Sequence, residues 1–135
     1  MKLFFLLFFT TLQAQTIKIE KAWVKAVPPM LKMSAAYMTI KNTGPKSIKL
    51  LSGKSSVADY VEIHTHRKVK GVMKMRQIDH VVIDAGKSAI LKPKSDHLML
   101  IQLQRQLKVG DIVDMSLKFS SGEVISLKIP VRKLP

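Results

Sequence analysis

The feature that most constrains the fold is a series of short segments, rich in β-branched residues, that begins after Thr16. Apolar and polar residues alternate in these segments, which is the periodicity of half-buried strands rather than of helices. Glycine, proline, asparagine and serine stand between them and predict turns. The expected strands cover residues 17–24, 36–40, 48–51, 61–66, 72–75, 81–83, 89–91, 98–103, 112–119 and 124–131.

About nine or ten short strands are too many for one flat sheet and favour an all-β domain, a β-sandwich with Greek-key connections. A chain of 135 residues with 47% hydrophobic content can bury the core of one such domain. Only residues 30–34 and 57–60 leave room for a helical turn. Trp23 is expected to anchor the core.

The first residues have the layout of a secretory signal peptide. Lys2 precedes an apolar run over residues 3–9, and Ala14 is a small residue at the expected cleavage point. The run is too short to span a bilayer, which takes about 20 apolar residues. We therefore expect residues 1–14 to be a signal peptide and residues 15–135 to be one exported, periplasmic domain without stable membrane insertion.

The chain contains no cysteine. An exported domain of this kind must depend on core packing rather than on disulfides. The absence of thiols also excludes cysteine nucleophiles, zinc-thiolate sites, iron–sulfur clusters and blue-copper centres. A site for a soft metal ion would have to be built from methionine and histidine.

The composition is strongly basic, with 23 Lys and Arg against 9 Asp and Glu and a formal net charge of +14. A positive field of this size attracts anionic partners. Nucleic acid is not the expected one, because the basic residues are scattered through strand-like segments with little aromatic interleaving. Lysines on the exterior of a β-protein also keep it soluble and protect its sheet edges.

Histidine and methionine are concentrated between residues 62 and 76, in the sequence EIHTHRKVKGVMKMR. His64 and His66 stand two apart, as do Met73 and Met75, and residues two apart in a strand point to the same face. The basic segment between the two pairs ends at Gly71. We predict a hairpin whose arms present imidazoles and thioethers to a shared ion.

A second pair of the same kind follows at His97 and Met99, which also stand two apart in an expected strand. Methionine is a common filler of hydrophobic cores, so residue type alone does not make Met75 or Met99 a ligand. The intervals between the four residues carry more information than their types. Ten residues separate His64 from Met75, twenty-one separate Met75 from His97, and one separates His97 from Met99.

These intervals match the hallmark of the periplasmic copper chaperones of the PCu(A)C type, and the chain resembles that family over nearly all of its exported part. Matching flanks include residues 22–24, 36–38, 71–76 and 97–100. The resemblance implies a cupredoxin-like β-sandwich that binds one Cu(I) through His64, Met75, His97 and Met99. It also implies delivery of that ion to a partner, often toward the copper centre of a terminal oxidase.

The chain departs from the family pattern at two positions. Thr65 stands where many members carry methionine, and His66 is an additional histidine. His66 and Met73 remain alternative donors, and an extra imidazole would suit Cu(II) as well as Cu(I).

The sequence therefore predicts a monomeric copper chaperone whose partner is a copper-accepting protein, such as a terminal oxidase subunit or a second copper chaperone. It contains no nucleophile elbow, zinc-hydrolase motif or phosphate-binding loop, so we do not expect an enzyme. Two alternatives stay open. One is a redox role of the site, and the other is an exported interaction module whose basic surface docks an anionic partner.

Overall fold

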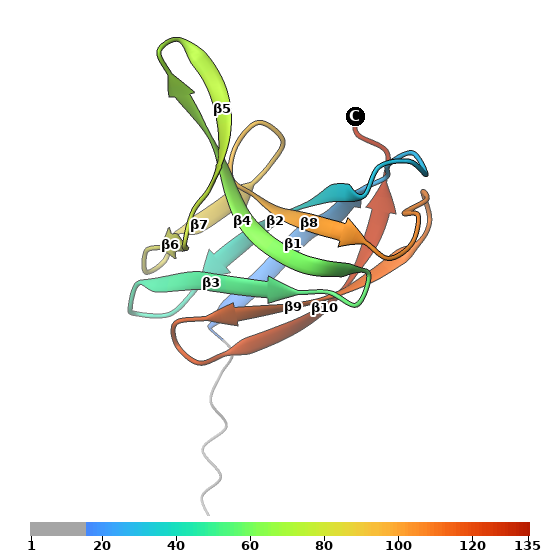
Figure 1. Ribbon diagram of the computed structural model, residues 1–135. Helices are drawn as coiled ribbons and strands as arrows, with labels where there is room; N and C mark the ends of the chain where they lie inside the picture. The colour runs from blue at the N-terminus through green and yellow to red at the C-terminus, as the bar shows by residue number, and fades with distance from the viewer. Residues whose placement is uncertain (1–15) are drawn as a thin grey trace, which may run out of the picture.

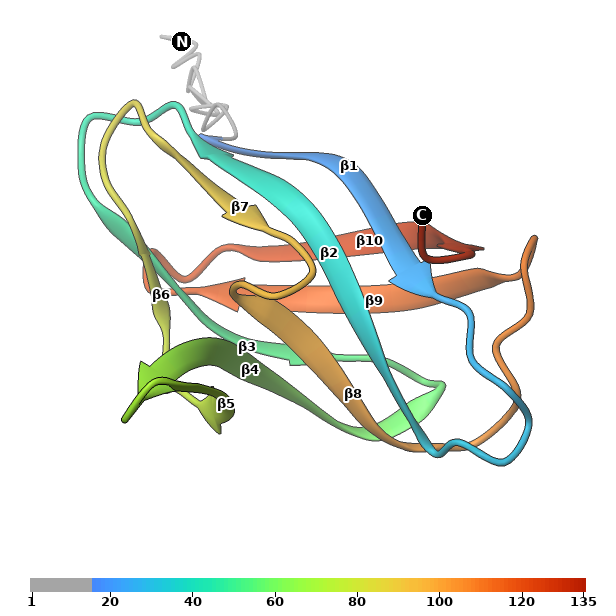
Figure 2. The same ribbon diagram turned by 90° about the horizontal axis from the view of Figure 1, so that it is seen from above.

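The computed structural model describes residues 16–135, which form ten β-strands (Figures 1 and 2). The predicted signal peptide lies outside these residues. The strands are β1 (Ile17–Lys25), β2 (Met33–Asn42), β3 (Ile48–Lys54), β4 (Ala58–Val69), β5 (Val72–Gln77), β6 (Val81–Ile83), β7 (Ser88–Leu91), β8 (His97–Leu103), β9 (Ile112–Phe119) and β10 (Val124–Arg132).

The strands follow the order β5-β4-β8-β2-β1-β10-β9-β3-β6, with β7 paired to β2. All of these pairings are antiparallel except that of β1 with β10. An additional contact between β3 and β4, at Gly53 and Val61, joins the strands that stand next to the two ends of the series. The result is a closed, flattened sandwich with β4, β8 and β2 in one layer and β9 and β10 in the other (Figure 2). The predicted all-β sandwich is confirmed.

The core lies between the two layers and takes every second residue of strands such as β9 and β10. Leu98 and Leu100 of β8 face it together with Ile63 of β4, while Leu117 and Phe119 face it from β9. The alternate residues of β8 are His97 and Met99, which therefore point to the outer face of their layer. They are nevertheless buried, with 3% and 9% of their surfaces exposed. The outer face of β8 is thus covered, and it is there that the candidate site forms.

The two segments that left room for a helical turn, residues 30–34 and 57–60, contain no helix. Residues 30–32 form a turn and loop, and β2 begins at Met33. β4 begins at Ala58, where pairing with Leu103 of β8 fixes an extended backbone. Short apolar runs are ambiguous between helix and strand, and here the long-range pairing decides. Among residues 16–135, no helix has the length and apolarity needed to cross a membrane.

The predicted hairpin is confirmed and is longer than expected. β4 and β5 pair from His64 with Gln77 to Val69 with Val72, around a two-residue turn. Both turn residues are left-handed, with φ of 50° at Lys70 and 80° at Gly71, as a type I′ turn requires. The hairpin projects from the body of the sandwich, above β8 in Figure 1. Its turn therefore lies away from the two main layers.

Candidate metal centre

The pairing of β4 with β8 brings the two predicted histidine ligands together. His64 stands directly opposite His97, and their ring centroids are 5.8 Å apart. Directly opposite residues of an antiparallel pair share a face of the sheet. The next pair along the same face is Glu62 with Met99. One face of two neighbouring strands thus holds two imidazoles, a thioether and a carboxylate.

The pairing of β4 with β5 adds the third strand. Met75 stands opposite His66, which lies on the same face of β4 as His64 because the two are two residues apart. The ring of His66 approaches that of His97 to a centroid distance of 5.3 Å. The two pairings together place all four predicted ligands, and His66, on one continuous face.

A cavity of about 320 Å³ opens on this face. Its wall includes the predicted ligands Met75, His97 and Met99, and also His66, Met33 and Tyr37. His64 does not line it, although its ring lies beside that of His97. The structure therefore brings three of the four predicted ligands into one cavity and places the fourth at its margin, while the additional histidine stands on the wall.

The orientation of His97 is set by the backbone of the preceding turn. Its Nδ1 lies 2.9 Å from the carbonyl oxygen of Ser95, so Nδ1–H donates and Nε2 keeps a free lone pair in the neutral ring. Burial lowers the pKa of His97, and the charges of His66 and His64 lower it further, whereas the bond to Ser95 and the charge of Asp96 act in the opposite direction. The net shift favours the neutral imidazole, which is the form that binds metal.

His64 is oriented by a carboxylate. Its Nε2 lies 2.7 Å from Oε2 of Glu62, so Nε2–H donates to the carboxylate. The remaining nitrogen, Nδ1, is buried and has no hydrogen-bond partner. A buried acceptor without a partner costs about 1–3 kcal/mol, and a metal ion would satisfy it. The arrangement, with one ring nitrogen held by a carboxylate and the other free, is the usual state of a metal-binding histidine.

The donor types on this face bear on which metal ion it suits. Among residues 16–135, no three His, Asp or Glu side chains are grouped closely enough to hold an ion without other donors. The donors that line the cavity on this face also include the thioethers of Met75 and Met99. Thioethers are soft donors, so the arrangement suits a soft monovalent ion.

Several residues that line this face could not be identified from the sequence alone. Met33 and Tyr37 come from β2, which is placed by the pairing of Ala35 with Met99. Tyr37 also contacts Trp23, with ring centroids 4.7 Å apart. Trp23 is therefore not the core anchor that the sequence suggested, because it is half-buried and packs on the site side of the layer. Glu62 was detectable, because it stands two residues before His64 in the same strand.

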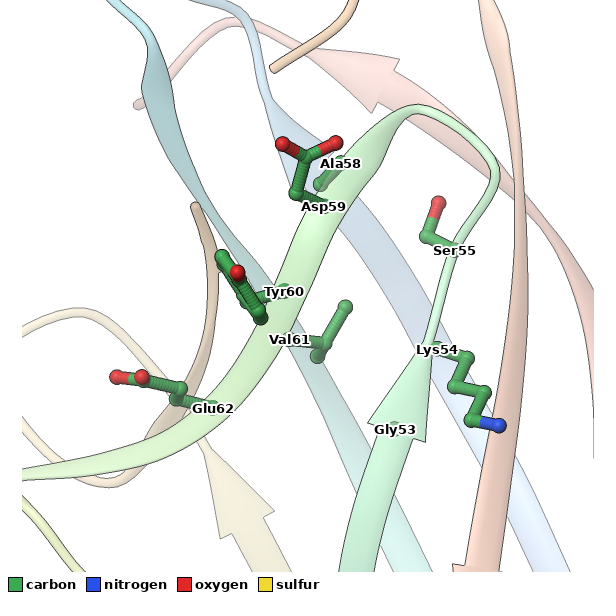
Figure 3. Close-up of a pocket in the computed structure, with 8 residues that line it drawn as sticks. All are labelled: Gly53, Lys54, Ser55, Ala58, Asp59, Tyr60, Val61 and Glu62. Carbon is green, nitrogen blue, oxygen red and sulfur yellow. The ribbon is translucent and has the colours of Figure 1, made fainter. Parts of the chain in front are cut away.

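A second hollow, of about 330 Å³, lies beside the connection between β3 and β4 (Figure 3). Tyr60 and Glu62 project from one side of β4 and Val61 from the other, as strand alternation requires. Its lining contains neither histidine nor methionine. This hollow therefore lacks the donors of a soft-metal site, which the cavity lined by residues of β8 and β5 contains.

Solved structures of copper proteins share this fold. The copper-bound PCuAC domain from PmoF2 matches with a TM-score of 0.76 at 20% identity, over 89% of this chain and 95% of that one, a likeness that shows the fold. The solution structure of CuI-DR1885 from Deinococcus radiodurans matches with a TM-score of 0.73 at 32% identity, over 92% of this chain and 83% of that one. The fold and the histidine–methionine face define a cupredoxin-like domain of the PCuAC type.

Proteins related in sequence identify the family to which the chain belongs. Lxx21020 of Leifsonia xyli subsp. xyli, a protein that carries a lipoprotein name, is 31% identical over 121 residues, which cover 89% of this chain and 72% of that protein. The sequence model of the LpqE-like family, described as a lipoprotein family, matches residues 17–131. The chain belongs to the LpqE-like family. The family resemblance inferred from the histidine and methionine intervals is confirmed.

Proposed function

We propose that the protein is a copper chaperone that binds one Cu(I) through His64, Met75, His97 and Met99 and delivers it to another protein. The observation that carries the proposal is the meeting of these side chains, from three strands, on one covered face. His64 contributes a buried nitrogen without a hydrogen-bond partner, and the other three line one cavity. The copper named in the structures of PmoF2 and CuI-DR1885 supports the choice of ion.

The charge of the protein favours a monovalent ion over a divalent one. The four donors are neutral, and Lys25 and Lys94 also line the cavity. A net charge of +14 opposes every cation, and the electrostatic cost doubles when the charge of the ion doubles. Soft thioethers compensate this cost for Cu(I) but not for Mg²⁺ or Ca²⁺, which prefer oxygen. Cu(II) remains an alternative cargo, for which His66 would be the additional imidazole.

The proposed ligands differ in exposure, and this difference favours release of the ion. Met75 lies on the projecting hairpin and has 44% of its surface exposed, whereas His97 and Met99 are buried. A partner can therefore replace Met75 first while the buried donors still hold the ion. The cavity of about 320 Å³ is larger than a metal ion and can admit a donor group of the partner. We propose no catalytic step, and the protein acts as a monomer.

The recipient that we propose is a copper-accepting protein, such as a terminal oxidase subunit or a second copper chaperone. This choice is supported by the resemblance to the copper chaperones and by the proposed site. Export to the periplasm is supported by the signal-like residues 1–14 and by the lipoprotein names of the family and of a relative.

The decisive experiment is an anaerobic titration with Cu(I) against a chromogenic competitor, on the wild type and on a Met75→Leu/Met99→Leu variant. Leucine roughly conserves the volume of methionine, so the fold is retained. We expect one tightly bound equivalent in the wild type and none in the variant. A Met30→Leu/Met115→Leu variant is the matched control, because it also replaces one exposed and one buried methionine, both outside the cavity.

Two outcomes would contradict the proposal. Failure of the wild type to compete for Cu(I) would mean that the donors serve packing only. Equal loss of binding in the two double variants would mean that methionine content, rather than this site, binds the ion. The interaction-module alternative, based on the net charge of +14, would then become the leading one.

A further inference from the structure

The β4–β5 hairpin leaves one edge of the sheet open. β5 is the last strand of the series, and among residues 16–135 no other strand pairs with it besides β4. All six of its residues are exposed, and the hairpin stands clear of the body in Figure 1. An exposed edge strand is a template for pairing with another extended segment.

The backbone groups on this edge can be assigned from the pairing. In a two-residue hairpin the pair next to the turn, Val69 with Val72, exchanges backbone hydrogen bonds, and such pairs then alternate with unbonded ones. At the other end of the ladder, the N–H of Ile78 donates to the carbonyl of Ile63, which agrees with this alternation. The amides and carbonyls of Met73 and Met75 therefore point outward, away from β4.

Positive charge is gathered beside this edge. Arg67 stands directly opposite Lys74, and Arg76 lies two residues further along the same face of β5. Like charges directly opposite in a sheet destabilise it. Among residues 16–135, none of these three side chains forms an ion pair with an acid, and Lys68 and Lys70 add further exposed charge near the turn. An anionic partner would relieve a repulsion that the hairpin carries by itself.

We propose that the edge of β5 binds an extended, acidic segment of the copper-accepting protein, which adds to the sheet as a strand beside Met73 and Met75. The identity of the partner rests on the proposed function, whereas the chemistry of the segment rests on the hairpin. The outward amides need a peptide backbone, and Arg67, Lys74 and Arg76 need carboxylates. A second copy of this chain does not fit, because pairing two β5 edges would bring six of these cations together.

The position of this edge links docking to transfer. Met75 is a proposed ligand and also one of the residues whose backbone groups face the partner. A strand added at β5 therefore lies next to the most exposed donor of the site. Docking and exchange of the ligand at Met75 become parts of one event.

The test uses the copper-free protein and a short synthetic peptide in which glutamate and threonine alternate. We expect the peptide to bind and to protect the amides of Met73 and Met75 from hydrogen exchange. An Arg67→Gln/Lys74→Gln/Arg76→Gln variant should bind it about tenfold more weakly, because three exposed charge pairs are lost. A Lys18→Gln/Lys49→Gln/Lys118→Gln variant removes the same charge from β1, β3 and β9 and should bind nearly as the wild type does.

A second pair of variants tests the backbone without changing any charge. Proline at position 73 removes an outward N–H and leaves the bonds to β4 intact, since proline is tolerated on the open side of an edge strand. Met73→Pro should weaken peptide binding, while Met73→Leu should not. A matching peptide of lysine and threonine should fail to bind.

Three results would overturn the proposal. Equal weakening in the two glutamine variants would show that the overall field, not the hairpin, attracts the peptide. Peptide binding without protection of Met73 and Met75 would exclude strand addition. Binding to phosphatidylglycerol vesicles in preference to the peptide would assign the charge to a lipid surface. These experiments contain no copper, so a negative result would count against the docking edge and not against the copper site. A failed Cu(I) titration would likewise count against the copper site and not against binding of the peptide.

Discussion

Glu62 holds His64 by a 2.7 Å contact between its Oε2 and the Nε2 of the ring, and so leaves the buried Nδ1 without a partner. The carboxylate fixes both the tautomer and the orientation of the imidazole. The contact therefore decides which atom of His64 is free to bind an ion.

Replacing Glu62 by glutamine should weaken Cu(I) binding. Loss of a carboxylate that orients a ligating histidine typically lowers metal affinity about 10–100-fold, and we expect a value near the lower end because Glu62 is partly exposed. The measurement is the competitive Cu(I) titration, with Glu20→Gln as the control, since Glu20 is an exposed acid paired with Lys41. Unchanged affinity in Glu62→Gln would show that His64 binds without this contact.

Substitution of the two neighbouring histidines should separate their roles. We expect His64→Gln to lower Cu(I) affinity at least about tenfold and His66→Gln to have a smaller effect, because only His64 leaves a buried nitrogen without a partner. Both variants are compared by Cu(I) competition after circular dichroism has verified the fold. The reverse order would assign the second imidazole to His66, which stands on the cavity wall.

The sequence predicted much of the fold because strand alternation and turn residues are local signals. The hairpin, β9 and β10 follow directly from such patterns, as does the position of His64, His66 and Met75 on one face of the hairpin. The contributions of Met33 and Tyr37 could not be predicted, since they depend on the register of β2 against β8, which joins residues far apart in the chain. The lack of a hydrogen-bond partner at Nδ1 of His64 could not be predicted either, because it depends on burial of that atom by the surrounding strands.

Acidification should destabilise the copper-free protein near the ordinary histidine pKa of 6.5. Burial lowers the pKa of His97, so the unfolded chain binds this proton more readily than the folded protein does. The contribution of His97 is fully present above about pH 6.5 and is lost as the pH falls from there toward the pKa of the folded state. Denaturant unfolding at a series of pH values measures the loss, and His97→Gln should reduce it.

A second acid transition should be separable from the first. The side chain and backbone amide of Ser56 donate to Asp114 and lower its pKa below 3.8. Because the pKa of Asp114 is lower in the folded protein than in the unfolded chain, the ionised carboxylate stabilises the fold. This contribution is present above about pH 3.8 and is lost only as the pH falls below that value. A loss of stability near pH 6.5 that persists in His97→Gln would have to come from another histidine.

Changes at the hairpin turn should alter the site without unfolding the domain. Gly71 has a φ of 80°, so Gly71→Ala should destabilise the hairpin by about 1 kcal/mol, whereas Lys70→Asn should stabilise it because asparagine tolerates the left-handed conformation. Hydrogen exchange along β5 should respond in opposite directions in the two variants. The denaturation midpoint should hardly move, since β5 is exposed throughout. A shift of that midpoint by either variant would show that the hairpin belongs to the cooperative core.

Oxidation by peroxide provides a direct test of Met75 as a ligand, with Ag(I) as a soft monovalent ion that does not cycle its redox state. In the metal-free protein Met30, Met73, Met75 and Met33 should oxidise first, because 90%, 54%, 44% and 43% of their surfaces are exposed. Metal coordination occupies the sulfur lone pair that the oxidant attacks. Loading with Ag(I) should therefore protect Met75 while Met30 and Met73 still oxidise, as peptide mass spectrometry would detect. Met73 is the internal control, since it lies two residues away on the same face of β5. Protection of both methionines would extend the ligand set to Met73, and protection of neither would remove Met75 from it.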